Sequence, residues 1–292
     1  MIMDLRFRCI SVEDANVYNL VVKKLRTAVG VFRERGVVGL VKLILRKIFF
    51  LPDEINLAKK TVLEHIKSLH NNTVRYGPFE NMQLAEKVWW GGGDAIPKIL
   101  GTYERHIQDY LVSLKDKVQG PFIDIGAADG YFALGVLVGG LFDKTYAFEI
   151  SEQGQEVLRN NAKQNGVVDN ISVSGEANYH SLKVLVEKYE SAAVLIDIES
   201  GEFDLLDDNM LDLLSRFHVI IEIHDRFSDE GPELKLALAR RASDYFDVSF
   251  KLPTSAPYCD FEELAHFSDN QRLLAFSENR RSSMEWMILT PR

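Results

Sequence analysis

The second part of this 292-residue chain alternates short apolar runs with helical patterns, and this alternation limits the folds open to it. Most runs are rich in β-branched or aromatic residues and apolar on both faces, as in strands with both sides buried. Strands of this kind that alternate with helices predict a doubly wound, mostly parallel sheet, which is an α/β, Rossmann-like fold. The predicted strands cover residues 122–125, 145–150, 171–173, 193–198, 219–223, 248–252 and 286–289.

The last two predicted strands have no clear helix between them, so this pair is expected to be antiparallel. Residues 253–283 instead form a long irregular connection. Long loops in compact domains are often functional, which suggests a lid over an acceptor molecule. The alternative is a solvated surface loop. The side chains expected to contact a sugar or phosphate are Tyr258, Arg272, Arg280 and Arg281.

The upstream region differs, and we predict a helical extension over residues 1–118 before a cofactor-binding domain at 119–292. Helical patterns cover about residues 37–50, 57–69 and 103–114. Residues 21–50 carry eight basic side chains against Glu34 alone. The helix at 37–50 therefore either lies on anionic lipid, docks on a partner protein, or packs with a solvated basic side.

A glycine-rich loop in the extension carries two adjacent tryptophans, Trp89 and Trp90. Their rings could stack on a sugar or a cofactor. Alternatively, they seal the extension onto the core.

The overall charge and the cysteines exclude several classes of protein. A formal net charge of −9 argues against a general nucleic-acid binder. Cys9 and Cys259 are far apart, which excludes a disulfide framework or a cysteine zinc site and favours a reducing compartment. No apolar run is long enough to cross a bilayer, and no signal peptide is evident. We expect a cytoplasmic protein, held at a membrane surface if residues 37–50 bind lipid.

The segment at residues 122–131 carries the cofactor argument. An apolar strand ends in a tight turn of small residues and a helix start, which brings backbone and free N–H groups close to a ligand. The dinucleotide fingerprint G-x-G-x-x-G fails here, because Ala128 and Tyr131 occupy its second and third glycine positions. The pattern D-x-G-x-x-x-G is instead typical of methyltransferases that use S-adenosylmethionine. The predicted contacts are Asp124, Gly126, Ala127, Asp129, Gly130 and Tyr131.

A second acidic residue supports this interpretation. Glu149 ends the next predicted strand, 23 residues after Gly126, where an ionised carboxylate can accept hydrogen bonds from both ribose hydroxyls. Glu176 and Ala177 follow the third strand and are expected near the adenine. The structural alternative is a tight turn without a ligand.

These residues, with two later segments at 195–202 and 219–225, resemble the FkbM-like family of class I methyltransferases. The resemblance covers about residues 120–290, although Ser200 and Gly201 replace a Gly-Ala pair of the family's pattern. It implies a seven-stranded sheet with an antiparallel last strand, and methylation of a hydroxyl, often on a sugar or another natural product. Residues 76–79 and 100–104 also resemble N-terminal regions of methyltransferases from surface-polysaccharide synthesis.

Several polar side chains fall at the ends of the fourth and fifth predicted strands, beside the expected sulfonium methyl. His224 is the best candidate for a base, and Asp197 could orient the cofactor's amino group or the acceptor. Glu222 completes the predicted catalytic set.

Two other interpretations of these side chains remain open. Asp197, Glu199, Glu222 and His224 could bind a divalent cation. Alternatively, His224 and Asp225 merely cap a strand. The competing functions are a nicotinamide-dependent oxidoreductase and a scaffold with the fold but no chemistry.

Overall fold

The computed structural model describes residues 54–85, 93–253, 261–278 and 284–292. The chain divides into two compact units, Met1–Ala58 and Lys59–Arg292. The predicted helix at 37–50, the Trp89-Trp90 pair, Tyr258, Arg280 and Arg281 lie outside the described residues.

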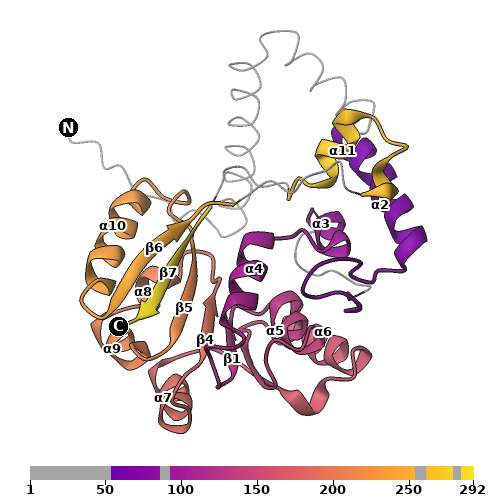
Figure 1. Ribbon diagram of the computed structural model, residues 1–292. Helices are drawn as coiled ribbons and strands as arrows, with labels where there is room; N and C mark the ends of the chain where they lie inside the picture. The colour runs from indigo at the N-terminus through magenta and orange to yellow at the C-terminus, as the bar shows by residue number, and fades with distance from the viewer. Residues whose placement is uncertain (1–53, 86–92, 254–260, 279–283) are drawn as a thin grey trace, which may run out of the picture. The chain divides into compact units, whose positions relative to one another are not determined.

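A seven-stranded sheet forms the centre of the second unit, with strand order β3-β2-β1-β4-β5-β7-β6 (Figure 1). All neighbouring strands pair in parallel except β7, which is antiparallel to both β5 and β6. The predicted doubly wound, mostly parallel sheet and its antiparallel final strand are therefore confirmed. The strands are β1 (Phe122–Ile125), β2 (Thr145–Phe148), β3 (Ile171–Ser174), β4 (Ala193–Ile196), β5 (His218–Ile223), β6 (Phe246–Lys251) and β7 (Glu285–Pro291).

Helices follow the parallel strands and cover both faces of the sheet (Figure 1). Upstream of the sheet are α2 (Glu54–His70), α3 (Ala95–Leu100) and α4 (Arg105–Leu114). The others are α5 (Tyr131–Val138), α6 (Glu152–Gln164), α7 (Tyr179–Lys188), α8 (Glu202–Leu205), α9 (Asp208–Leu214), α10 (Gly231–Ala242) and α11 (Asp269–Ala275), with 3₁₀ turns η1 (Val168–Asn170) and η3 (Glu262–Leu264).

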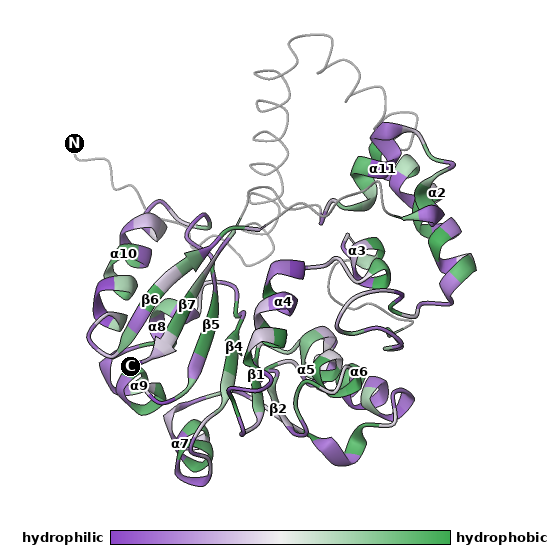
Figure 2. Cartoon of the chain, viewed as in Figure 1, coloured by the Kyte–Doolittle hydropathy of each residue, from purple (hydrophilic) through white to green (hydrophobic). Residues whose placement is uncertain are grey.

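Successive side chains of a strand point to opposite faces of the sheet, so the core has two layers, one on each face. In β4, Ala193 and Leu195 join a cluster with α4, α5 and α6, whereas Val194 and Ile196 join a cluster with α7, α9 and α10. Because both faces are covered, the central strand β4 is apolar along its whole length, whereas the edge strands β3 and β6 also carry polar residues (Figure 2). Polar side chains at the ends of the central strands are therefore exceptions that need an explanation.

Residues between 59 and 118 share the core of the sheet. Phe79 packs edge-on against Tyr131 with ring centroids 5.4 Å apart. A Cβ at Gly135 would lie 2.4 Å from the Phe79 ring, so the glycine makes room for this contact. The boundary between the two compact units lies between Ala58 and Lys59. The domain boundary predicted from the sequence was instead placed after residue 118.

The connection between β6 and β7 is more ordered than predicted. It contains η3 and α11, and α11 begins at a capping box formed by Ser268 and Gln271. The helix was missed because it has only seven residues, too few for a clear periodic pattern. Leu264 and Ala275 bury their side chains with Val62 in a third apolar cluster. This packing anchors the described part of the connection to α2 and α3.

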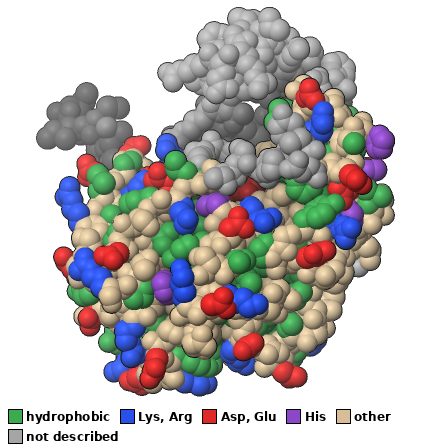
Figure 3. All heavy atoms as spheres, in the orientation of Figure 1, with side chains coloured by type: hydrophobic (Ala, Val, Ile, Leu, Met, Phe, Trp, Pro, Cys, Tyr) green, Lys and Arg blue, Asp and Glu red, His purple; other side chains and the backbone are tan. Residues whose placement is uncertain are grey.

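Acidic and basic side chains are interspersed over the face seen in Figure 3. No large patch of only acidic or only basic side chains is visible on the described part of this face. Among the residues that the structure describes, no helix is long and apolar enough to span a bilayer.

Candidate active site

One cavity of about 1650 Å³ opens at the carboxyl ends of the parallel strands. The residues that follow β1, β2, β3, β4 and β5 all contribute to its lining, as do residues 93–103 from upstream. This is the edge at which open α/β sheets bind their ligands. A cavity of this size is larger than a typical site for one small molecule, so it has room for a cofactor and an acceptor.

The glycines of the turn after β1 are required by the fold itself. Gly126 has φ +92°, and a Cβ there would lie 1.9 Å from the carbonyl oxygen of Asp197 at the end of β4. Gly130 has φ +89°, and its Cβ would lie 2.2 Å from Leu158. Both positions therefore demand glycine with or without a ligand. Gly126 lines the cavity, but Gly130 caps α5 and is outside the described lining.

Glu149 joins the end of β2 to this turn. Its carboxylate accepts the N–H of Ala128 at 2.9 Å and the N–H of Ser151 at 2.8 Å, one on each oxygen. The first bond holds Ala128 at φ +46°, which is unusual for a residue with a side chain. Each oxygen keeps a further lone pair. Glu149 is 7% exposed and lines the cavity, so its carboxylate can still accept hydrogen bonds from hydroxyl groups of a ligand.

Asp124 is the buried carboxyl of the predicted motif. It lies on β1 and is 2% exposed. Burial raises the pKa of Asp124 to about 7, and the negative charges of Glu149 and Asp129 also raise it. A hydrogen bond from the backbone of Ala133 acts in the opposite direction and lowers the pKa. Bound positive charge would favour the ionised form.

Lys98 is a site residue that the sequence analysis missed. Its ammonium group lies 2.8 Å from Asp94 and 3.4 Å from Asp129. The same group lies 5.0 Å from the ring centre of Tyr103 and 5.6 Å from that of Tyr131. Burial lowers the pKa of Lys98, but the charges of Asp129 and Asp94 outweigh it, so the pKa is raised. A cationic group from α3 therefore lies at the turn after β1. A single lysine in a short helix gave no sequence signal.

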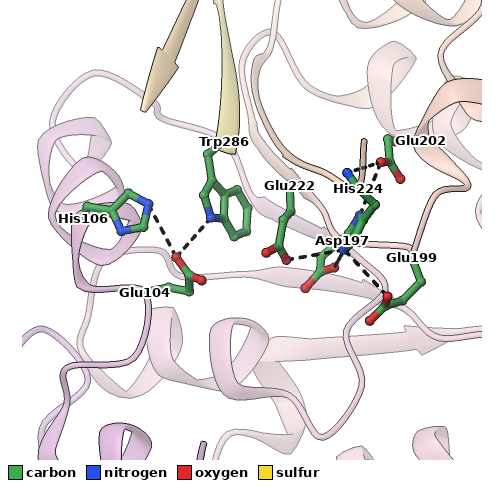
Figure 4. A network of polar contacts seen from close by, with 8 residues as sticks. All are labelled: Glu104, His106, Asp197, Glu199, Glu202, Glu222, His224 and Trp286. Carbon is green, nitrogen blue, oxygen red and sulfur yellow. Dashed lines mark hydrogen bonds and ion pairs between the residues drawn. The ribbon is translucent and has the colours of Figure 1, made fainter. Parts of the chain in front are cut away.

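At the carboxyl ends of β4 and β5, three carboxylates surround the Nε2 atom of His224 (Figure 4). The distances from Nε2 are 3.5 Å to Asp197, 3.8 Å to Glu199 and 3.8 Å to Glu222. We refer to these four residues as the His224 cluster. All four line the cavity, and His224 is only 3% exposed.

Glu202 contacts the imidazole of His224 at its other ring nitrogen, Nδ1 (Figure 4). Its Oε1 accepts the backbone N–H of His224 at 2.8 Å and lies 3.3 Å from Nδ1. Burial lowers the pKa of His224, but the Glu202 hydrogen bond and the charges of Glu222, Glu202 and Glu199 outweigh it and raise the pKa. Glu202 is fully buried, and the sequence analysis gave it no role.

Another buried carboxylate, that of Glu104, lies near the cluster (Figure 4). Glu104, with φ +44°, accepts the indole N–H of Trp286 at 3.0 Å and lies 3.4 Å from Nε2 of His106 (Figure 4). Trp286 is the partner of Glu222 across the β5–β7 ladder. This arrangement ties the segment before α4 to β7, the strand that pairs with β5 and its Glu222.

The structure brings nearly all of the predicted site residues together, although their roles stay predictions. Asp225 lies outside the described lining of the cavity and pairs with Lys235 at 3.7 Å, which suits a structural role. Arg272 forms an ion pair with Asp269 at 2.6 Å and does not line the cavity. The predicted residues that line it are Asp124, Gly126, Ala127, Asp129, Tyr131, Glu149, Glu176, Ala177, Asp197, Glu199, Glu222 and His224.

Comparison with solved structures returns matches of low sequence identity, and several of them are described as methyltransferases. A precorrin-6y C5,15-methyltransferase from Geobacter metallireducens GS-15 is 12% identical, with a TM-score of 0.42 over 64% of this chain and 89% of that one. The cofactor-bound protein Rv0187 from MTB is 10% identical, with a TM-score of 0.43 over 86% and 97%. A spermidine synthase in complex with the transition-state analogue AdoDATO is 12% identical, with a TM-score of 0.43 over 63% and 57%.

No protein-family model matches the chain, and no curated protein matches it. The strand order of the chain itself therefore establishes its fold, and the residues of the cavity indicate its chemistry.

Proposed function

We propose that the chain is an S-adenosylmethionine-dependent methyltransferase that methylates a hydroxyl group of a saccharide or a related natural product. The observation that carries this proposal is the acidic lining of one cavity that runs from the end of β2 to the end of β5. Glu149 lies at one end of this lining and the His224 cluster at the other.

The charge of the cavity favours this cofactor over a dinucleotide. Among the described residues that line it, only Lys98 and Arg226 carry a fixed positive charge, whereas carboxylates are numerous. S-adenosylmethionine carries a sulfonium, an ammonium and one carboxylate, so its net charge is positive. A nicotinamide dinucleotide would instead place a pyrophosphate at the turn, beside Asp129. Opposite charges attract and like charges repel at these distances, so the sulfonium compound fits better.

Each part of the cofactor has a matching group. The free lone pairs of Glu149 suit the two ribose hydroxyls, and Glu176 and Ala177 lie after β3 for the adenine. The ammonium of Lys98 suits the carboxylate of the methionine part. The sulfonium methyl would then face the His224 cluster across the cavity.

The reaction needs an oriented nucleophile and a proton acceptor. The acceptor oxygen attacks the methyl carbon, the carbon–sulfur bond breaks, and its electron pair stays on sulfur, which becomes a neutral thioether. The hydroxyl proton passes to the His224 cluster. Carboxylates that accept hydroxyl hydrogen bonds also suit a polyhydroxylated acceptor.

Calorimetry tests the cofactor, with S-adenosylhomocysteine and NAD⁺ titrated in parallel into the purified chain. Saturable binding of the first compound alone is expected, and a preference for NAD⁺ would refute the proposal. For the acceptor, methyl-labelled S-adenosylmethionine is incubated with a panel of monosaccharides and nucleotide sugars. Label that survives alkaline treatment indicates an ether methyl group rather than an ester. Binding without transfer to any member would favour a scaffold.

A further inference from the structure

The structure assigns a divalent-cation site to Asp197, Glu199 and His224, with Glu222 beside it. One ligand atom from each of the first three lies within 4.8 Å of the others. Imidazole and carboxylate ligands together suit a first-row transition-metal cation such as Mn²⁺. In octahedral coordination at about 2.1 Å, neighbouring ligand atoms are about 3 Å apart and opposite ones about 4.2 Å apart. The separations from Nε2 fall between these limits.

The orientation of His224 supports a ligand at Nε2. Among the described residues Nε2 makes no hydrogen bond, although the side chain is 97% buried and the residue lines the cavity. Its ring is aimed at three carboxylates at 3.5–3.8 Å, beyond good hydrogen-bond distance. A cation between them would give the Nε2 atom of the imidazole a partner.

Glu202 supplies a second, independent observation. Its Oε1 is placed to accept a hydrogen bond from Nδ1–H of His224, and no described polar group reaches its buried Oε2. A proton on Nδ1 leaves the lone pair on Nε2, which is the tautomer that binds a metal. Carboxylates that hold metal-binding histidines in this way are common, and their loss costs about 10- to 100-fold in metal affinity. Glu202 is thus a positioning residue.

The cation would also narrow the acceptor class, an inference that rests on the proposed function. A hydroxyl bound to the cation loses its proton more readily, and an acceptor with two adjacent oxygen atoms could chelate it. With Nε2 occupied, His224 acts as a ligand instead of the base expected from the sequence. The acceptor proton then passes to the carboxylate of Glu222, and the alkoxide attacks the methyl group.

Mn²⁺ binding to the full chain tests the site without any need for activity. Electron paramagnetic resonance and calorimetry with MnCl₂ should show one saturable equivalent. Asp197→Asn and Glu199→Gln should each weaken it at least about tenfold, and Glu202→Gln about 10- to 100-fold. Glu199 is half exposed, so its variant should keep the fold. Asp204→Asn, which changes another carboxylate of the same cavity, is the matched control.

Absence of saturable Mn²⁺ binding would overturn the inference, and so would equal weakening by Asp204→Asn. S-adenosylhomocysteine binding is measured on the same sample without metal. If that compound binds and Mn²⁺ does not, the cation site alone fails. If Mn²⁺ binds and the compound does not, the cation site stands and the proposed function fails.

Discussion

The carboxylate of Glu149 accepts the backbone N–H of Ala128 at 2.9 Å, and so connects the end of β2 to the turn after β1. One side chain therefore both holds the turn in its left-handed conformation and offers lone pairs to the cavity. The structural and ligand-binding roles of Glu149 can be separated by measuring stability and affinity on the same variant.

Replacement of Glu149 by glutamine should weaken S-adenosylhomocysteine binding about 10- to 100-fold. Hydrogen bonds to a charged group contribute about 1.5–3 kcal/mol each, and the amide loses the charge and one acceptor. Calorimetry measures the affinity for S-adenosylhomocysteine, and thermal unfolding measures how much the substitution changes the stability of the fold. Glu156→Gln, an exposed change on the neighbouring α6, is the control. Equal affinity of the two variants would contradict the assignment.

Replacement of Gly126 by alanine should destabilise the fold by about 4 kcal/mol or more, because its Cβ would meet the carbonyl of Asp197 at 1.9 Å. Gly140 offers a matched control, since it also has a positive φ but nothing within 4 Å of its Cβ position. Gly140→Ala should therefore cost only about 1–2 kcal/mol. Urea denaturation compares the two variants, and similar losses would be evidence against the predicted clash.

Replacement of Lys98 by methionine should weaken S-adenosylhomocysteine binding about tenfold or more, because a charged hydrogen bond to its carboxylate is lost. Binding of 5′-methylthioadenosine, which lacks the amino-acid part, should not change. Competition calorimetry gives the ratio of the two affinities, and Lys188→Met, a change of an exposed side chain on α7, is the control. A parallel loss for both compounds would show that Lys98 acts only through the fold.

Asp124 should make the ligand-free protein less stable as the pH rises. Its folded pKa of about 7 lies above the ordinary 3.8, so between these values the folded state holds a proton that the unfolded state has lost. The free energy of unfolding therefore falls by up to about 1.4 kcal/mol per pH unit over this range. Asp124→Asn should remove this contribution. Urea denaturation at pH 5 and pH 8 measures it, and an unchanged slope in the variant would contradict it.

Much of the site at the carboxyl ends of the parallel strands could be predicted from the sequence, because this part of the site depends on local chain geometry. The strand, tight turn and helix around Gly126 are encoded within ten residues, and Glu149 follows at the next strand end. Parallel strands bring their carboxyl ends to one edge, so the side chains of Asp197 and His224 could be expected together. The short helix α11 was missed because seven residues carry little periodicity.

The amino-acid sequence by itself determined the α/β alternation, the antiparallel last strand and the acidic residues at the strand ends, because apolar period and turn sterics are local properties. Only the tertiary structure decided that Lys98 from α3 reaches the turn after β1, and that Glu202 directs the imidazole of His224 toward three carboxylates. Those placements depend on the packing of helices far apart in the chain, for which no local pattern carries a signal.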